Sequence, residues 1–190
     1  TKHPGDKEIP WHQDLNYWPI DPPVNTSAWL AIDDVNTDNS CVRIIPGSHK
    51  KILQHIRSTE SMQFGEMADT YNVDLTKAID MVLKPGEFFI FSERTLHQSN
   101  ANASNRRRMG LAMRFTVPFV KIDHERPPLY PNHKAVLVRG RDTLGKNRMQ
   151  LIAVGEKSQI EEGLKKFGPV EIVDASQLGG GAGGGRRGRR

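Results

Sequence analysis

Short runs of apolar residues, separated by turn-forming residues, dominate the first two thirds of the chain. Residues 27–34 form one such run, rich in apolar and aromatic side chains, and the turn formers at 36–40 close it. A second run spans 41–45 and ends at the Pro-Gly pair 46–47, because proline cannot donate to a central β-ladder and glycine tolerates a tight turn. The pattern predicts a β-hairpin followed by a loop.

Residues 50–80 lack a regular pattern, and we expect an excursion there with one or two short helices. Regular runs resume as a strand at 81–83, a turn at 84–87 and a strand at 88–91, and one more strand is predicted at 109–117. Short strands without alternating long helices favour a sandwich, barrel or jelly roll over a doubly wound parallel sheet. We therefore expect a mainly β fold.

The pattern weakens beyond residue 118. A possible strand, a helix at 158–167 and a final strand at 170–173 are the elements we expect there, and no chemical motif accompanies them. We divide the chain into a core domain over 1–120, a C-terminal extension of the same domain over 121–178, and a Gly- and Arg-rich tail over 179–190 that is too polar to bury a core and is expected to be disordered.

The composition fits one ordinary globular domain. The chain has 190 residues, of which 36% are hydrophobic and 26% charged. Its single cysteine, Cys41, excludes an intramolecular disulfide framework and any cysteine-rich zinc or iron–sulfur site. No apolar run approaches the length of a membrane span, and no signal-peptide pattern opens the chain. We expect a soluble, cytoplasmic protein with no membrane partner, and nothing in the sequence indicates its oligomeric state.

The net charge of +5 comes mostly from the last five residues, which contain four arginines and so leave 5 − 4 = +1 for the rest of the chain. A nucleic-acid-binding protein that uses Arg106 to Arg108 and the Arg-Gly tail is one alternative. We do not expect a nucleic-acid partner, because these cationic residues are segregated and the β-core contains no recognised nucleic-acid-binding motif.

Two histidines and one aspartate suggest a metal site. His12 and Asp14 are two residues apart, so in an extended segment both side chains lie on one face. His97 follows 97 − 12 = 85 residues later, after the strand at 88–91, and could supply a second imidazole. Such a set leaves three octahedral positions open, as non-haem Fe(II) oxygenases require. The alternative is chance, because an H-x-D tripeptide is common and a single histidine is more often packed than metal-bound.

A candidate anion site follows His97. Arg108 could form a bidentate fork with the far carboxylate of a dicarboxylate such as 2-oxoglutarate, and the hydroxyl of Ser99 could donate to the same group. The alternative is that Arg106, Arg107 and Arg108 form one solvated or phosphate-facing patch. The presence of candidate metal ligands in the same sequence favours the co-substrate interpretation for Arg108.

Several motifs occur in a fixed order over about residues 9–118. They are Pro10-Trp11-His12-Gln13-Asp14, Tyr17-Trp18-Pro19, Ala28-Trp29, Asn39, Ile45-Pro46-Gly47-Ser48-His49, Lys84-Pro85-Gly86-Glu87, and His97-Gln98-Ser99 followed by Asn102 and Arg108. Together they resemble the phytanoyl-CoA dioxygenase family.

The resemblance implies a double-stranded β-helix, also called a jelly roll or cupin-like fold, with a few short helices. It implies that Fe(II) is bound by His12, Asp14 and His97, and that 2-oxoglutarate is the co-substrate. The residues that it places at the co-substrate are Arg108, Ser99 and Trp29, to which we add Gln13 from the metal motif. Taken alone, Trp29 could equally be a core aromatic residue.

The implied activity is that of a dioxygenase, which uses O2 to hydroxylate an unactivated carbon of a small organic substrate and releases succinate and CO2. Related halogenases have a small residue at the position of Asp14, so a carboxylate there favours hydroxylation. The alternative is a catalytically silent, cupin-like module that binds a metal or ligand without turnover. The remaining histidines are expected outside the site, with His49 in a family turn and His3, His55, His124 and His133 at the surface.

The position of the H-x-D motif differs from the family pattern. Members of the family usually have helices and strands before this motif that brace the sheet, whereas only eleven residues precede His12 here. We therefore expect a fragment that lacks its N-terminal supporting part. Such a loss would matter because the precise placement of metal ligands depends on the residues that surround them.

Overall fold

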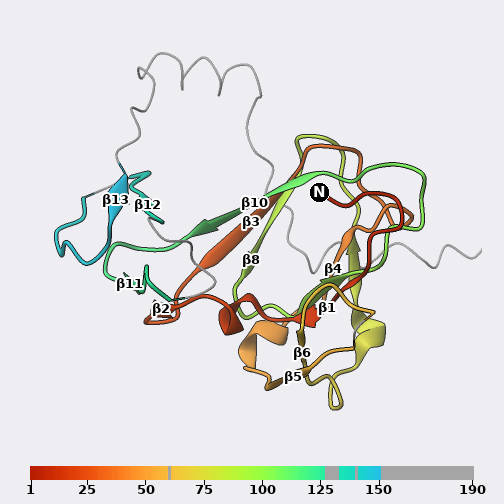
Figure 1. The fold of residues 1–190 in the computed structure, drawn as a ribbon, viewed down its shortest axis with the longest axis horizontal. Coiled ribbons are helices and arrows are strands. Elements are labelled where there is room, and N and C mark those ends of the chain that lie inside the picture. Colours follow the sequence, from red (N-terminus) through yellow and green to blue (C-terminus); the bar gives the residue numbers. More distant parts are fainter. Residues whose placement is uncertain (60, 127–132, 140, 151–190) are drawn as a thin grey trace, which may run out of the picture. The chain divides into compact units, whose positions relative to one another are not determined.

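β-strands are the main regular elements of the computed structural model, which describes residues 1–150 except 60, 127–132 and 140 (Figure 1). The described residues all belong to one unit, Thr1–Ile152. The predicted helix at 158–167, strand at 170–173 and tail at 179–190 lie outside the described residues, so the three-part division of the chain stays a prediction.

Two sheets form the core of the fold. The first has the order β1-β9-β4-β7, with bounds Ile9–His12, His97–Ser99, Val42–Ile44 and Ile79–Met81. The second has the order β10-β3-β8, with bounds Gly110–Phe115, Thr26–Ala31 and Phe88–Ser92. All neighbours within both sheets are antiparallel.

Smaller elements surround these sheets. The pairs are β5 with β6 (His55–Arg57, Glu66–Ala68), β2 with β11 (Ile20–Asp21, Lys121–Ile122) and β12 with β13 (Ala135–Val136, Met149–Gln150). The helical elements are the single-turn 3-10 helices η1, η2 and η3 (Asp14–Asn16, Ser48–Lys50, Leu75–Lys77). In the part of the chain that the structure describes, no helix is long and apolar enough to cross a bilayer.

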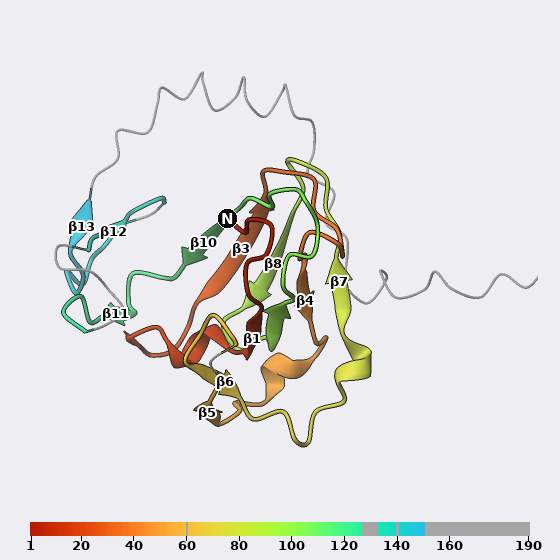
Figure 2. The ribbon, with the colours of Figure 1, turned by 45° about the vertical axis from the view of Figure 1, so that its right-hand side comes forward.

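The hydrophobic core lies between the two sheets, which face each other in Figure 2. Trp29 and Phe91 from the second sheet share one cluster with Val42, Ile44 and Met81 from the first. This arrangement confirms the mainly β fold that the short, punctuated strands predicted, and the jelly roll that the family resemblance implied. It follows from strand geometry, because alternate residues of each strand point inward and the facing sheets bury them together.

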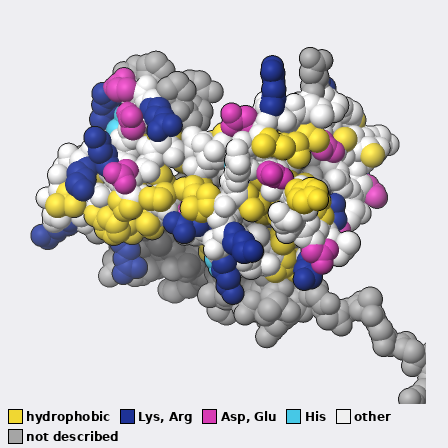
Figure 3. Space-filling model, turned by 90° about the horizontal axis from the view of Figure 1, so that it is seen from below, with side chains coloured by type: hydrophobic (Ala, Val, Ile, Leu, Met, Phe, Trp, Pro, Cys, Tyr) yellow, Lys and Arg dark blue, Asp and Glu magenta, His cyan; other side chains and the backbone are white. Residues whose placement is uncertain are grey.

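The outer face of the second sheet is also rich in apolar residues. Phe88, Ile90, Leu111 and Phe115 remain 41–64% exposed on it. A separate view of the molecule, from below, shows a band of hydrophobic side chains with lysines and arginines beside it (Figure 3). The outer face of the second sheet is therefore exposed among the described residues. Burial between the two sheets does not account for the apolar residues that β8 and β10 present on it.

The predicted pairing of the first two strands was wrong. The runs at 27–34 and 41–45 do not form a hairpin, because β3 pairs with β8 and β10, whereas β4 pairs with β7 and β9. Likewise β7 and β8 belong to different sheets, so the turn between them crosses from one sheet to the other. The irregular excursion after residue 50 contains the β5–β6 hairpin as well as short helical turns. Apolar runs locate strands, but long-range packing selects their partners.

Candidate metal centre

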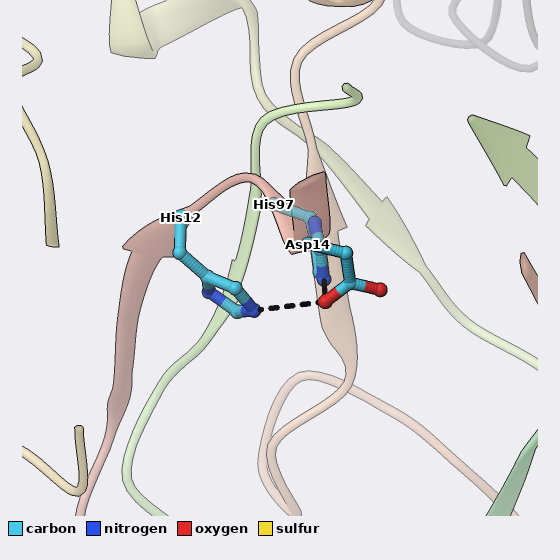
Figure 4. Close-up of side chains that lie close together, drawn as sticks. All are labelled: His12, Asp14 and His97. Atoms are coloured by element: carbon cyan, nitrogen blue, oxygen red, sulfur yellow. Dashed lines mark ion pairs between the residues drawn. The ribbon is translucent and has the colours of Figure 1, made fainter. Parts of the chain in front are cut away.

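Strand pairing places the two candidate histidines side by side. In the antiparallel ladder of β1 and β9, His12 is the direct partner of His97, although the two are 85 residues apart in the sequence. Asp14 lies two residues beyond His12, at the start of η1. All three side chains are buried and converge in Figure 4. The register of two adjacent strands therefore assembles the predicted triad.

The distances within this triad fit a single metal ion. The Nε2 atoms of His12 and His97 lie 3.6 Å and 3.8 Å from Oδ1 of Asp14. One potential ligand atom from each of the three residues lies within 4.8 Å of the other two. Two imidazoles and one carboxylate are also the donor set that non-haem Fe(II) sites use, so the residues present fit that metal.

The backbone fixes the orientation of both imidazoles. Nδ1 of His12 lies 2.7 Å from the carbonyl oxygen of Pro10, and Nδ1 of His97 lies 2.8 Å from that of Thr95. Because a carbonyl oxygen only accepts, each Nδ1 carries the proton and donates it. Each Nε2 therefore keeps its lone pair, directed towards Asp14, and is ready to bind a metal.

The electrostatics favour the protonation states that metal binding needs. Burial, followed by the neighbouring His12, lowers the pKa of His97 to about 4. Burial alone would raise the pKa of Asp14, but the neighbouring His12, His97 and Arg114 together lower it below its ordinary value. At neutral pH the aspartate is therefore ionised and His97 is neutral, so no proton has to leave either group when a cation binds.

A hollow of about 180 Å³ adjoins the triad and contains the predicted co-substrate residues. Arg108, Ser99 and Trp29 line it together with the three candidate ligands. The Arg108 guanidinium is buried, donates from Nε to the carbonyl oxygen of Ser40 at 3.0 Å, and lies 5.3 Å from the centre of the Trp29 ring. The guanidinium of Arg108 and the triad therefore line the same hollow.

The polar groups in this hollow are incompletely satisfied. Among the described residues, no acidic side chain pairs with Arg108, and burial lowers its pKa. The buried hydroxyl of Ser99 has no hydrogen-bond partner in the part of the chain that the structure describes. Buried cations and hydroxyls normally have partners. A bound dicarboxylate would satisfy both groups, so the hollow fits 2-oxoglutarate chemically.

Gln13 has a different role from the one predicted. Its side-chain amide donates to the carbonyl oxygens of Lys51 and Arg94, at 2.8 Å and 2.5 Å, and accepts from the backbone N–H of Leu53 at 2.8 Å. Gln13 is not among the residues that line the hollow. The geometry gives no support to a co-substrate contact. Instead, Gln13 ties the backbone of two loops to the metal motif.

The other histidines lie outside the triad, as expected, but one expectation about their burial was wrong. His49 and His3 are exposed. His124, predicted at the surface, is buried. Its Nε2 accepts a hydrogen bond from the backbone N–H of Arg148, and its Nδ1 lies 3.0 Å from the carbonyl oxygen of His133. It is a packed histidine that bridges two loops.

The three consecutive arginines do not form one surface patch. Arg107 is half exposed and makes a two-pronged ion pair with Asp33, with both contacts at 2.9 Å. Arg108 points the opposite way, into the hollow. Alternation along an extended chain explains the difference, because successive side chains face opposite sides.

Sequence reasoning missed two residues at the triad. Arg114 on β10 and Ser27 on β3 are direct partners in the ladder, and both contact Oδ2 of Asp14. A signal was present, because Arg114 lies six residues after Arg108 in an extended segment, and even spacing puts two side chains on the same face.

The inner face of the second sheet presents its side chains in two rows. Arg114, Ser27 and Phe91 form the row at the metal triad, where the Phe91 ring packs edge-on against His97 at 4.9 Å. Ala112, Trp29 and Phe89 form the next row, which includes the ring below the Arg108 guanidinium. The first row therefore lies at the candidate metal ligands, and Trp29 and Ala112 of the second row line the hollow beside Arg108.

The lack of a side chain at Gly110 leaves room for the Trp29 ring. A Cβ atom on Gly110 would lie 2.1 Å from Cζ2 of this buried ring. We expect Gly110→Ala to displace the ring and to lower the free energy of unfolding by about 1–3 kcal/mol, the usual cost of overpacking. Urea denaturation measures the effect. The matched control is Gly65→Ala, where a Cβ would meet nothing within 4 Å; equal stability of the two variants would contradict the assigned packing.

The buried ammonium group of Lys2 makes the stability depend on pH. Its Nζ donates to the carbonyl oxygens of Ser99 and Asn100, and burial, followed by the charge of Arg108, lowers its pKa from 10.5 to about 8. Between these pH values the unfolded chain binds more protons, so the Lys2 contribution to the free energy of unfolding rises with pH. We expect a rise of at most about 3 kcal/mol.

A Lys2→Met variant isolates this contribution. Buried Cys41 and half-buried Tyr17 have pKa values raised to about 11 and about 12, and they titrate in both proteins alike. The difference in unfolding free energy between wild type and variant should therefore move in favour of the wild type from pH 8 to pH 10.5. Parallel pH profiles in urea denaturation would show that Lys2 keeps its ordinary pKa.

The jelly-roll fold and the buried His-Asp-His triad together define a class, the double-stranded β-helix metalloproteins. The sequence profile of the phytanoyl-CoA dioxygenase (PhyH) family matches residues 1–110, more than half of the chain, so the chain belongs to this family. The match confirms the resemblance seen in the motifs. Phytanoyl-CoA dioxygenase 1 of Oryza sativa subsp. japonica is 35% identical over 115 residues, which cover 59% of this chain and 40% of the rice protein.

Solved structures support the same fold. EvdO2 from Micromonospora carbonacea var. aurantiaca, complexed with 2-oxoglutarate, is 28% identical with a TM-score of 0.51, over 60% of this chain and 47% of that one. CytC3 with Fe(II) and alpha-ketoglutarate is 27% identical with a TM-score of 0.54, over 78% and 57% of the two chains. The chain spans about 40% of the length of the curated relatives that it matches first.

Proposed function

We propose that this chain carries the active site of an Fe(II)- and 2-oxoglutarate-dependent dioxygenase, which hydroxylates an unactivated carbon of a small organic substrate and releases succinate and CO2. The observation that carries the proposal is one small hollow that holds both a buried metal-binding triad and a buried arginine without an acidic partner among the described residues. The ligands of two similar structures agree with it, because EvdO2 was solved with 2-oxoglutarate and CytC3 with Fe(II) and alpha-ketoglutarate.

Each residue of the hollow has a defined part in this proposal. Nε2 of His12, Nε2 of His97 and Oδ1 of Asp14 would hold the iron. When bound, the iron supplies the oxygen chemistry that couples decarboxylation of the co-substrate to hydroxylation. The guanidinium of Arg108 would bind the far carboxylate of 2-oxoglutarate with two parallel hydrogen bonds, and the hydroxyl of Ser99 would donate to the same group.

Aromatic side chains shield the metal side of the hollow. The rings of Phe64 and Tyr17 pack edge-on against His12, at 5.1 Å and 5.8 Å, and Phe91 packs against His97. Phe64 also lines the hollow. These rings restrict water at the triad, which strengthens the electrostatic interactions of the charged ligands.

Anaerobic titration with Fe(II) and 2-oxoglutarate tests the proposal without knowledge of the substrate. The expected result is a visible metal-to-ligand charge-transfer band that requires protein, metal and co-substrate together. Succinate is the matched control ligand, because it lacks the keto oxygen needed for chelation and should give no band. Metal binding without this band would favour the catalytically silent metal-binding alternative, and folded protein that binds neither would refute the proposal.

A further inference from the structure

The two carboxylate oxygens of Asp14 face different partners. Oδ1 points to the imidazole nitrogens of His12 and His97, whereas the other oxygen turns away from them in Figure 4. That second oxygen, Oδ2, lies 2.9 Å from the guanidinium of Arg114 and 3.4 Å from the hydroxyl of Ser27. The carboxylate is therefore held on the side opposite the histidines.

The number of oxygens that Asp14 offers decides how many positions stay open on a metal. A carboxylate can bind a cation with one oxygen or with both. With two imidazoles and one oxygen, an octahedral ion keeps three open positions, enough for a chelating keto acid and O2. If both carboxylate oxygens bound, only two positions would remain, and co-substrate and O2 would compete for them.

We propose that Arg114 is a positioning residue that restricts Asp14 to coordination through one oxygen and so keeps the third position open. The inference rests on the proposed function, because it concerns the same metal site. The guanidinium of Arg114 occupies Oδ2 with a short, charge-assisted hydrogen bond, which a rotating carboxylate would have to break.

The surroundings of Arg114 favour positioning over simple packing. Its strand β10 reads Gly-Leu-Ala-Met-Arg-Phe, and Arg114 is its one charged residue. The Arg114 side chain is 25% exposed, its buried Nε has no partner among the described residues, and the Trp18 ring lies 5.8 Å from Cζ. A leucine or methionine would fill this space without leaving a buried donor unpaired, so the ion pair with Asp14 is what the arginine adds.

The register of the sheet holds this contact in place. Arg114 and Ser27 are Cα partners in the ladder of β10 and β3, so two adjacent strands deliver their side chains to the same carboxylate oxygen. A contact from rigid strands is more precise than one from a loop. The sheet itself therefore sets the rotation of Asp14.

Two titrations test the proposal. Mn(II) binding by isothermal calorimetry, and the Fe(II)–2-oxoglutarate charge-transfer band at saturating metal, are compared for wild type, Arg114→Met and Arg114→Lys. Arg43→Met is the matched control, because Arg43 makes an ion pair with Asp80 at 2.8 Å and does not line the hollow. Circular dichroism checks that each variant is folded; if Arg114→Met is not, Arg114→Gln takes its place with the same expected result.

We expect Arg114→Met to weaken Mn(II) binding by about 10–100-fold, the usual effect of losing a partner of a metal ligand. The charge-transfer band should also shift or weaken even at saturating iron, which a purely structural role would not cause. Arg114→Lys should recover part of both signals, and Arg43→Met should match the wild type. Wild-type binding and an unchanged band in Arg114→Met would overturn the role of Arg114 alone, whereas failure of the wild type to bind Mn(II) would overturn the proposed function with it.

Discussion

Replacing His97 by alanine is expected to weaken the binding of Fe(II) or Mn(II) by more than about 100-fold, because it removes one of three ligands, a larger change than the loss of a supporting hydrogen bond. The imidazole is buried and neutral at working pH, with its Nε2 lone pair directed at Asp14. Apart from His12, which is itself one of the three candidate ligands, no described histidine lines the hollow and could replace it. Isothermal calorimetry with Mn(II) measures the loss.

The matched control for this variant is His49→Ala. His49 is an exposed histidine of η2 and lies outside the hollow. Its replacement should leave Mn(II) affinity unchanged. If His97→Ala bound the metal as tightly as His49→Ala, the assignment of the triad as the metal site would be wrong, provided that both variants show the wild-type circular dichroism spectrum.

Arg108→Leu is expected to separate co-substrate binding from metal binding. The affinity for 2-oxoglutarate, followed by the charge-transfer band at saturating Fe(II), should fall by about 100-fold, because a bidentate charge-assisted contact is lost, at about 1.4 kcal/mol for each factor of ten. Mn(II) affinity should stay close to wild type, because the guanidinium of Arg108 is held by the carbonyl oxygen of Ser40 and the Trp29 ring, and among the described residues it forms no ion pair with Asp14.

Arg107→Leu controls for the loss of one positive charge. This neighbour of Arg108 makes an exposed ion pair with Asp33, and such pairs contribute little to stability. Its replacement should leave 2-oxoglutarate binding intact. A comparable loss of affinity in both variants would instead indicate a general electrostatic effect of the basic segment, and no specific contact from Arg108.

The candidate metal ligands could be predicted from the sequence because their spacing reflects local geometry. His12 and Asp14 lie within one short segment, and the resemblance to the family identified His97 as the second imidazole. Strand positions were also readable, since apolar runs mark them at β3, β4, β8 and β10. What connects these features is the register of β1 with β9, and no local pattern contains it.

The features that sequence reasoning missed depend on contacts between distant strands. Pairing of β3 and β4 was predicted from their proximity in the chain, but in a jelly roll the chain passes from one sheet to the other. His124 looked like a surface residue because its partners, His133 and the backbone of Arg148, come from later loops. Arg114 was passed over because the strand around it is otherwise apolar.

The register of β10 in the second sheet affects both the candidate metal site and the adjacent hollow. Successive side chains of a strand face opposite sides, so a slip of β10 by one residue would turn Arg114 and Ala112 outward together and bring Met113 and Leu111 to the inside. Misregistered chains would therefore lose, in a single step, the contact of Arg114 with Asp14 and the contribution of Ala112 to the hollow. In a mixed preparation, the fraction of molecules that bind metal in the intended geometry should equal the fraction that accept 2-oxoglutarate.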